Sequence, residues 1–118
     1  MNANAIIKEL FGDDVEWNVH FWYVRPDPSS EEFTVLRVDI TNVSCETFSR
    51  VFNLPAPIHG FETEDDVYCV IDIQNDDKLR VHYGMRQEKG SPYSVVITHD
   101  RLRTAYELAT KNWIITNG

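Results

Sequence analysis

The stretch that decides the fold is "VYCVIDIQNDDKLRVHYGM", which spans residues 67–85. On both sides of the polar cluster at residues 75–77, side chains of one kind recur at every second position, which is the period of a β-strand. We therefore predict two antiparallel strands joined by a three-residue turn at residues 75–77. In this register one face of the hairpin is apolar or aromatic. A slip by one residue would bury the charges of the other face, so the register is strongly specified.

The other face of this hairpin carries opposite charges on facing strands. The register sets Asp72 opposite Arg80 and Asp66 opposite Arg86. We expect the Asp72–Arg80 pair to be exposed and to contribute under roughly 1 kcal/mol. Further facing pairs include Gln74 with Lys78, Ile73 with Leu79, Ile71 with Val81, Val70 with His82 and Cys69 with Tyr83.

The rest of the chain is divided by clear breaks into further elements. Residues 15–24 and 33–40 alternate as strands and are separated by "RPDPSSEE", which predicts an antiparallel hairpin with a long loop. A fifth strand is expected at residues 93–98. The whole order is α-β-β-α-β-β-β-α, an α+β fold with an antiparallel sheet of about five strands in a single domain, residues 1–118.

Three short helices are expected, each with a capping signal. Asn4 is the expected cap of the first helix and Gly12 the residue after its end. Asn42 and Ser44 are both candidate caps of a helix that ends near residue 52. Asp100 is the expected cap of the last helix, whose apolar stripe has helical spacing. The stripe consists of Leu102, Ala105, Tyr106, Ala109 and Trp113.

Composition and charge limit the class of protein to which this chain can belong. Of the 118 residues, 42% are hydrophobic and 25% charged, which is typical of one globular domain. The sequence holds no long apolar run and no secretory signal pattern, and its two cysteines suit small core residues, so we expect a cytoplasmic protein without membrane contact. The net charge of −8 disfavours direct nucleic-acid binding.

The negative charge is uneven along the chain. Residues 1–77 hold four basic residues against sixteen carboxylates, a net −12, whereas residues 78–118 hold seven against three, a net +4. Much of the acidic excess lies in connections, and loops can converge on one surface. We therefore predict a partner-binding surface that uses the loop acids and one aromatic anchor. The predicted residues are Glu62, Glu64, Asp65, Asp76, Asp77 and Trp22.

Trp22 is the anchor because it adjoins Tyr23 on a strand, so the two rings must point to opposite faces. One of them can therefore lie outside the core, unless helices cover both faces of the sheet. The latter interpretation remains open from the sequence alone.

Sequence motifs for catalysis and metal binding are missing. The four histidines are isolated, no zinc or calcium pattern occurs, and Cys69 and His82 point to opposite faces in the predicted register. We therefore predict no catalytic residue, no metal ligand and no cofactor. Two solvated loops remain the simplest alternative explanation of the acidic clusters.

The prediction for function is a non-enzymatic inhibitor that neutralises a basic, nucleic-acid-handling protein such as a nuclease toxin. An immunity protein or antitoxin and a phage-encoded anti-defence inhibitor, each acting as a nucleic-acid mimic, both fit. One alternative is a small enzyme or metal-binding domain that uses the loop between His59 and Asp66. Another is an acidic dimeric secretion-type chaperone whose exposed apolar strand captures a client. The sequence leaves the oligomeric state open.

Overall fold

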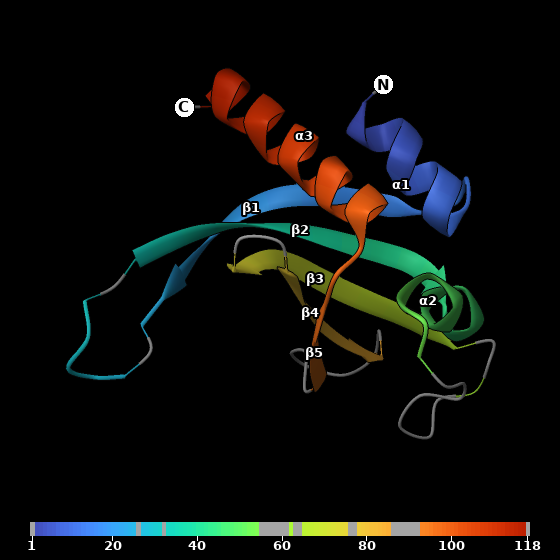
Figure 1. Cartoon of the computed structure of the whole chain (residues 1–118), viewed down its shortest axis with the longest axis horizontal. Helices are drawn as coiled ribbons and strands as arrows, with labels where there is room; N and C mark the ends of the chain where they lie inside the picture. Colours follow the sequence, from blue (N-terminus) through green and yellow to red (C-terminus); the bar gives the residue numbers. More distant parts are fainter. Residues whose placement is uncertain are drawn as a thin grey trace.

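The computed structural model describes residues 2–25, 27–31, 33–54, 62, 65–75, 78–85 and 93–117. Within these ranges, three helices and five strands follow the predicted order α-β-β-α-β-β-β-α, so the predicted α+β fold is confirmed (Figure 1). The elements are α1 (Ala3–Phe11), β1 (Glu16–Val24), β2 (Phe33–Ser44), α2 (Cys45–Phe52), β3 (Asp66–Asn75), β4 (Lys78–Met85), β5 (Tyr93–Ile97) and α3 (Asp100–Asn117).

The strands form one antiparallel sheet in which each strand pairs with its neighbours in the sequence, in the order β1-β2-β3-β4-β5. The predicted register of β3 and β4 is confirmed from Val67 to Ile73, and Asp72 lies opposite Arg80. Arg86, the predicted partner of Asp66, lies outside the described residues. The end of the hairpin differs from the prediction, because Asn75 rather than Gln74 faces Lys78. A register shift of one residue in β3, a β-bulge, shortens the connection at this point.

A second irregularity interrupts the pairing of β2 with β3 between Ile40 and Val43. Asn42 lies there with a φ of 65°, in the left-handed region that asparagine tolerates better than most residues. Its Nδ2 donates a hydrogen bond to the backbone oxygen of Asp14 at 2.6 Å. Asn42 is therefore a bulge residue of β2, and Ser44 is the cap of α2, accepting from the backbone N–H of Thr47 at 3.2 Å.

The N-cap of α1 lies two residues earlier than predicted. The side chain of Asn2 accepts a hydrogen bond from the backbone N–H of Ala5 at 2.8 Å, so Asn2 is the N-cap. Asn4 accepts instead from Nε1 of Trp17 at 3.0 Å and ties α1 to the start of β1. Gly12 ends the helix with a φ of 101°, the positive value for which glycine was predicted there.

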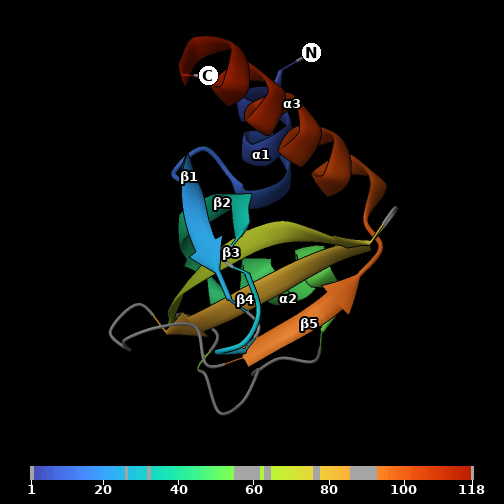
Figure 2. The ribbon, with the colours of Figure 1, turned by 90° about the vertical axis from the view of Figure 1, so that its left-hand side faces the viewer.

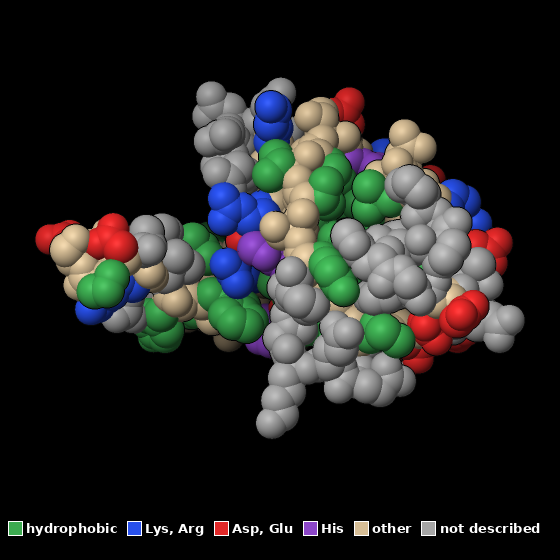
Figure 3. Space-filling model, turned by 90° about the horizontal axis from the view of Figure 1, so that it is seen from below, with side chains coloured by type: hydrophobic (Ala, Val, Ile, Leu, Met, Phe, Trp, Pro, Cys, Tyr) green, Lys and Arg blue, Asp and Glu red, His purple; other side chains and the backbone are tan. Residues whose placement is uncertain are grey.

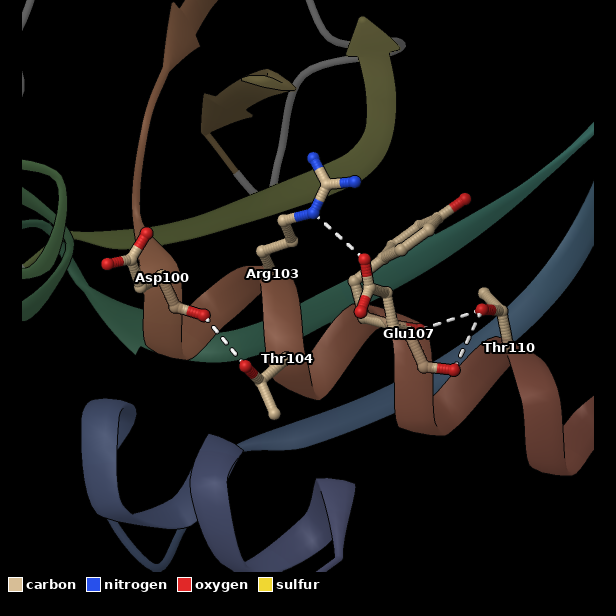
Figure 4. A network of polar contacts seen from close by, with 6 residues as sticks. Asp100, Arg103, Thr104, Glu107 and Thr110 are labelled. Carbon is tan, nitrogen blue, oxygen red and sulfur yellow. Dashed lines mark hydrogen bonds and ion pairs between the residues drawn. The ribbon is translucent and has the colours of Figure 1, made fainter. Parts of the chain in front are cut away.

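The long helix α3 is capped by His99 rather than by Asp100. Nδ1 of His99 accepts a hydrogen bond from the backbone N–H of Leu102 at 3.2 Å. Asp100 contributes its backbone oxygen, which accepts from the hydroxyl of Thr104, and further along the helix Arg103 pairs with Glu107 (Figure 4). The prediction missed this cap because an imidazole is a less usual acceptor at this position than a carboxylate.

All three helices pack on the same face of the sheet, and α1 and α3 lie side by side over β1 and β2 (Figures 1 and 2). The core lies between these layers and is built from the alternate apolar residues of each strand, as the period of two requires. Phe48 of α2, for example, packs against Tyr83 of β4 with ring centroids 4.9 Å apart. The predicted stripe of α3 is confirmed, with Leu102 and Ala105 almost fully buried.

Candidate functional site

The opposite face of the sheet is covered by no helix among the described residues, and we call it the open face. Figure 3 shows it, with Lys, Arg and His side chains gathered near its middle and Asp and Glu side chains towards its two ends. The strand pairing places Asp39, Val70 and His82 in one row across β2, β3 and β4. His20 and Arg37 face each other in the next row, on β1 and β2.

Arg37 and Asp72 form the central ion pair of the open face. Nε of Arg37 lies 3.0 Å from Oδ2 of Asp72, and the guanidinium carbon lies 4.9 Å from the centroid of the Trp22 ring. The pair is electrostatic rather than a well-aligned hydrogen bond, because the Nε atom has no hydrogen-bond partner. Asp72 is only 7% exposed. The predicted exposed Asp72–Arg80 pair is therefore corrected: the residues face each other, but Asp72 is buried and pairs with Arg37 from β2.

His82 lies on the other side of the same carboxylate. Its Nε2 is 3.8 Å from Oδ2 of Asp72, which is too far for a hydrogen bond. Burial lowers the pKa of His82, and the positive charges of Arg37 and Arg80 lower it further, against the opposing effect of Asp72. The imidazole is therefore held towards its neutral form, with Nε2 buried and unpartnered.

Asp39 and His20 form a second polar pair on neighbouring strands. Oδ2 of Asp39 contacts Nε2 of His20, whose ring lies edge-on to Trp22 at a centroid distance of 6.3 Å. The other carboxylate oxygen, Oδ1 of Asp39, is buried and has no hydrogen-bond partner. Buried polar atoms without partners are uncommon in folded proteins, so their concentration on this face calls for a ligand or for ordered water.

These side chains surround a hollow of about 420 Å³ in the open face. Val70 lies between Asp39 and His82 in the row and is itself part of the lining. The described lining holds no Ser or Cys side chain, and its one aliphatic hydroxyl belongs to Thr41. The lining residues are Trp22, Arg37, Asp39, Thr41, Tyr68, Val70 and His82.

Two of the predicted loop acids, Glu62 and Asp65, lie elsewhere, at the end of the sheet where β1 begins and β2 ends. Glu16 faces Thr41, Ser44 faces Asp66, and the N–H of Cys45 donates to the backbone oxygen of Asp65 at 2.8 Å. These pairings bring three separate segments to one place, which we call the acidic end. Its carboxylates are Asp13, Asp14, Glu16, Glu46, Glu62, Asp65 and Asp66.

Few basic side chains adjoin the acidic end in the part of the chain that the structure describes. Lys8 and Arg50 are the basic residues of the adjoining helices, and Nζ of Lys8 donates to a backbone oxygen rather than to a carboxylate. Among the described side chains, Asp13, Glu46 and Glu62 are exposed and have no ion pair. By contrast, Asp27 and Glu31 lie beyond the far ends of the same strands, because Val24 of β1 faces Phe33 of β2.

The six predicted partner-binding residues are therefore only partly brought together. Glu62 and Asp65 belong to the acidic end, where Oδ2 of Asp65 accepts from the backbone N–H of Glu62 at 2.9 Å. Trp22 lies six residues along β1 from Glu16, about 20 Å away, on the open face and 40% exposed. The remaining three predicted residues, Glu64, Asp76 and Asp77, lie outside the described residues.

Candidate redox and metal chemistry finds little support in the described part of the chain. Cys45 and Cys69 are free and buried, and burial raises the pKa of the Cys69 thiol. Cys69 points into the core while His82 lies on the open face, as predicted. The described residues contain no group of three potential metal ligands, and none of their helices is long and apolar enough to cross a membrane.

The sequence analysis missed the hollow, because it considered His82 as a possible catalytic partner of Cys69 and did not single out Arg37 or Asp39. A signal was present, because all three are polar residues inside strands whose other side chains are mostly apolar. The signal became specific only once the order of the strands was known.

The fold and the hollow together define a small α+β domain with one helix-covered and one open sheet face. No family model, curated protein or solved structure matches this chain. Its function is therefore argued from the geometry alone.

Proposed function

We propose that the protein is a non-enzymatic, acidic binding protein that occupies a basic surface of a nucleic-acid-handling protein and thereby inhibits or neutralises it. The observation that carries the proposal is the acidic end, where seven carboxylates from three segments come together and the adjoining helices supply two basic residues. A converged surface of one sign attracts an oppositely charged partner and competes with nucleic acid for it. An immunity protein or antitoxin and a phage-encoded anti-defence inhibitor, either of them cytoplasmic, are equally compatible.

Trp22 has a different role in this proposal from the acidic residues. The acidic end accelerates association, because charges act on the partner over distances of about the Debye length. A partly exposed tryptophan 20 Å away, by the strand rise of about 3.4 Å per residue, makes contact only after docking. Its loss should therefore raise the dissociation rate, which is typical of aromatic anchors.

The test begins with capture of the partner on immobilised protein from a native extract and its identification. Association rates are then measured against the purified partner at rising salt. The double variant Asp13→Asn/Glu62→Gln should associate several-fold more slowly and with a weaker salt dependence. The control variant Glu31→Gln/Glu107→Gln changes the net charge equally but away from the acidic end, and it should associate at close to the wild-type rate.

Equal rates for the two double variants would show that only net charge matters and would remove the acidic end as a binding surface. Failure of the partner to lose nucleic acid when the protein is added would contradict the mimicry. Turnover of a nucleic acid, ester or nucleotide by the purified protein would overturn the non-enzymatic assignment.

A chaperone is the second candidate, because β1 is an edge strand with exposed aromatic residues. Phe21 is 51% exposed although it contacts Trp113, and Tyr23 is 72% exposed. An apolar edge strand can receive an extended client segment. A monomeric mass in multi-angle light scattering would count against the dimeric chaperone.

A further inference from the structure

We propose that the hollow of the open face is a binding site for a neutral, planar heterocycle whose edge carries an N–H donor beside a carbonyl acceptor, as in the lactam form of a nucleobase. This site is separate from the acidic end, and the inference does not depend on the proposed function. It rests on the shape of the hollow, on three buried polar atoms that have no hydrogen-bond partner and on the balance of charge around them.

The shape of the hollow favours a flat ligand. Asp39 and His82 flank Val70 on the two neighbouring strands, so their backbones lie about 10 Å apart across the hollow. Val70 provides an apolar floor, and the aromatic side chains of Trp22 and Tyr68 form part of the rim. The volume of about 420 Å³ falls within the range of roughly 300–1,000 Å³ that is usual for small-molecule sites.

The polar atoms specify the edge of this ligand. Oδ1 of Asp39 can only accept a hydrogen bond while the carboxylate is ionised, so it requires an N–H on the ligand. Nε of Arg37 is a donor and lies 3.0 Å from Oδ2 of Asp72. Nε2 of His82 lies 3.8 Å from the same oxygen. In the tautomer of the neutral imidazole that has its proton on Nε2, this nitrogen is a second donor beside Nε of Arg37, and the two can serve one carbonyl oxygen.

The charge around the hollow excludes simple ions as its preferred ligand. Arg37 and Asp72 neutralise each other, and Asp39 has His20 as its partner. A free anion would meet two carboxylates, whereas a free cation would meet the guanidinium of Arg37. A neutral group with a donor and an acceptor side by side satisfies all three unpartnered atoms without adding charge.

The site can be tested with free bases. Uracil and hypoxanthine carry the lactam edge, 1,3-dimethyluracil keeps the ring and carbonyls but lacks the N–H groups, and inorganic phosphate represents a simple anion. Each probe is titrated into the ¹⁵N-labelled protein and followed by chemical-shift changes. We expect at least one of the two lactams to bind with a Kd at or below about 1 mM, to shift the signals of Val70 and Trp22, and to bind at least tenfold more tightly than 1,3-dimethyluracil or phosphate.

Two variants and a control locate the site. Asp39→Leu removes the acceptor at similar size, and Val70→Phe fills the floor, so each should weaken lactam binding at least tenfold. Ser94→Ala lies in the same cross-strand row on β5 but outside the lining, and it should bind like the wild type. The dispersion of the backbone signals verifies that each variant is folded.

Several results would overturn the inference. If neither lactam shifts any signal at 10 mM or so, a concentration well above weak fragment affinities, the hollow holds water only. Equal binding of 1,3-dimethyluracil would show that the N–H to Asp39 is not recognised. Tighter binding of phosphate would make the hollow an anion site, and unchanged binding by folded Val70→Phe would place the ligand elsewhere.

Discussion

Nε of Arg37 lies 3.0 Å from Oδ2 of Asp72, and this pair joins β2 to β3 at the centre of the open face. The two side chains are 17% and 9% exposed, so the charges depend on each other rather than on solvent. Trp22 covers the guanidinium from the side of β1. The pair therefore links two neighbouring strands, and Arg37 is also part of the lining of the hollow.

Removing Arg37 should destabilise the fold far more than removing Arg80, although Arg80 is the residue that directly faces Asp72. Arg37→Met leaves a buried carboxylate without its partner, which costs about 3 kcal/mol. Arg80→Met removes a charge that has no described ion pair and should cost under about 1 kcal/mol. Urea unfolding of both variants measures the difference, and equal losses would contradict the assignment of the ion pair to Arg37.

Stability should fall as the pH is lowered from neutral, in part because of His82. Burial, together with Arg37 and Arg80, holds the pKa of His82 in the folded protein below its ordinary value of 6.5, whereas Asp72 opposes this shift. The unfolded chain therefore binds more protons than the folded one as the pH falls through 6.5, so the free energy of unfolding decreases in that direction. His82→Gln should flatten this slope between about pH 7.5 and 5. An unchanged slope in the variant would show that His82 does not titrate differently in the two states.

Tyr106 should stabilise the protein up to alkaline pH. Its hydroxyl donates a hydrogen bond to the backbone oxygen of Leu36 at 2.6 Å, and burial, followed by the charge of Asp72, raises the pKa of its phenol to about 12. Tyr106→Phe should cost about 1 kcal/mol at neutral pH. Since the folded pKa lies above the unfolded value near 10, the contribution is complete below about pH 10 and is lost as the pH rises towards 12. The variant should therefore lose less stability than the wild type over this interval, and an equal loss would exclude the ionisation of Tyr106 as its cause.

Asn42 should be sensitive to substitution for two separable reasons. Its φ of 65° is unfavourable for residues with a Cβ, and its side chain holds the backbone oxygen of Asp14 at 2.6 Å. Asn42→Ala loses both features and should cost about 2 kcal/mol, whereas Asn42→Gly restores the backbone freedom and should cost about 1 kcal/mol. Thermal unfolding of the two variants tests the order, and a Gly variant less stable than the Ala variant would contradict the role of the left-handed backbone.

The sequence by itself determined the elements of this fold and most of their local pairing. The register of β3 and β4 follows from alternation within a short stretch, because burial of one face forbids a slip by one residue. The stripe of α3 and the glycine after α1 are likewise properties of near neighbours in the chain. The caps were harder to predict, because two neighbouring polar residues compete for the free N–H groups at each helix start. Asn2 rather than Asn4 accepts at α1, and His99 rather than Asp100 accepts at α3.

Only the tertiary structure decided which charges meet. Asp72 pairs with Arg37 because β2 lies beside β3, a relation that alternation within either strand cannot encode. The same order gathers Asp13, Glu46 and Glu62 at one end of the sheet and separates them from Trp22. Side-chain period and capping act over a few residues, whereas ion pairs, the hollow and the acidic end join segments tens of residues apart, so they exist only once the sheet is assembled.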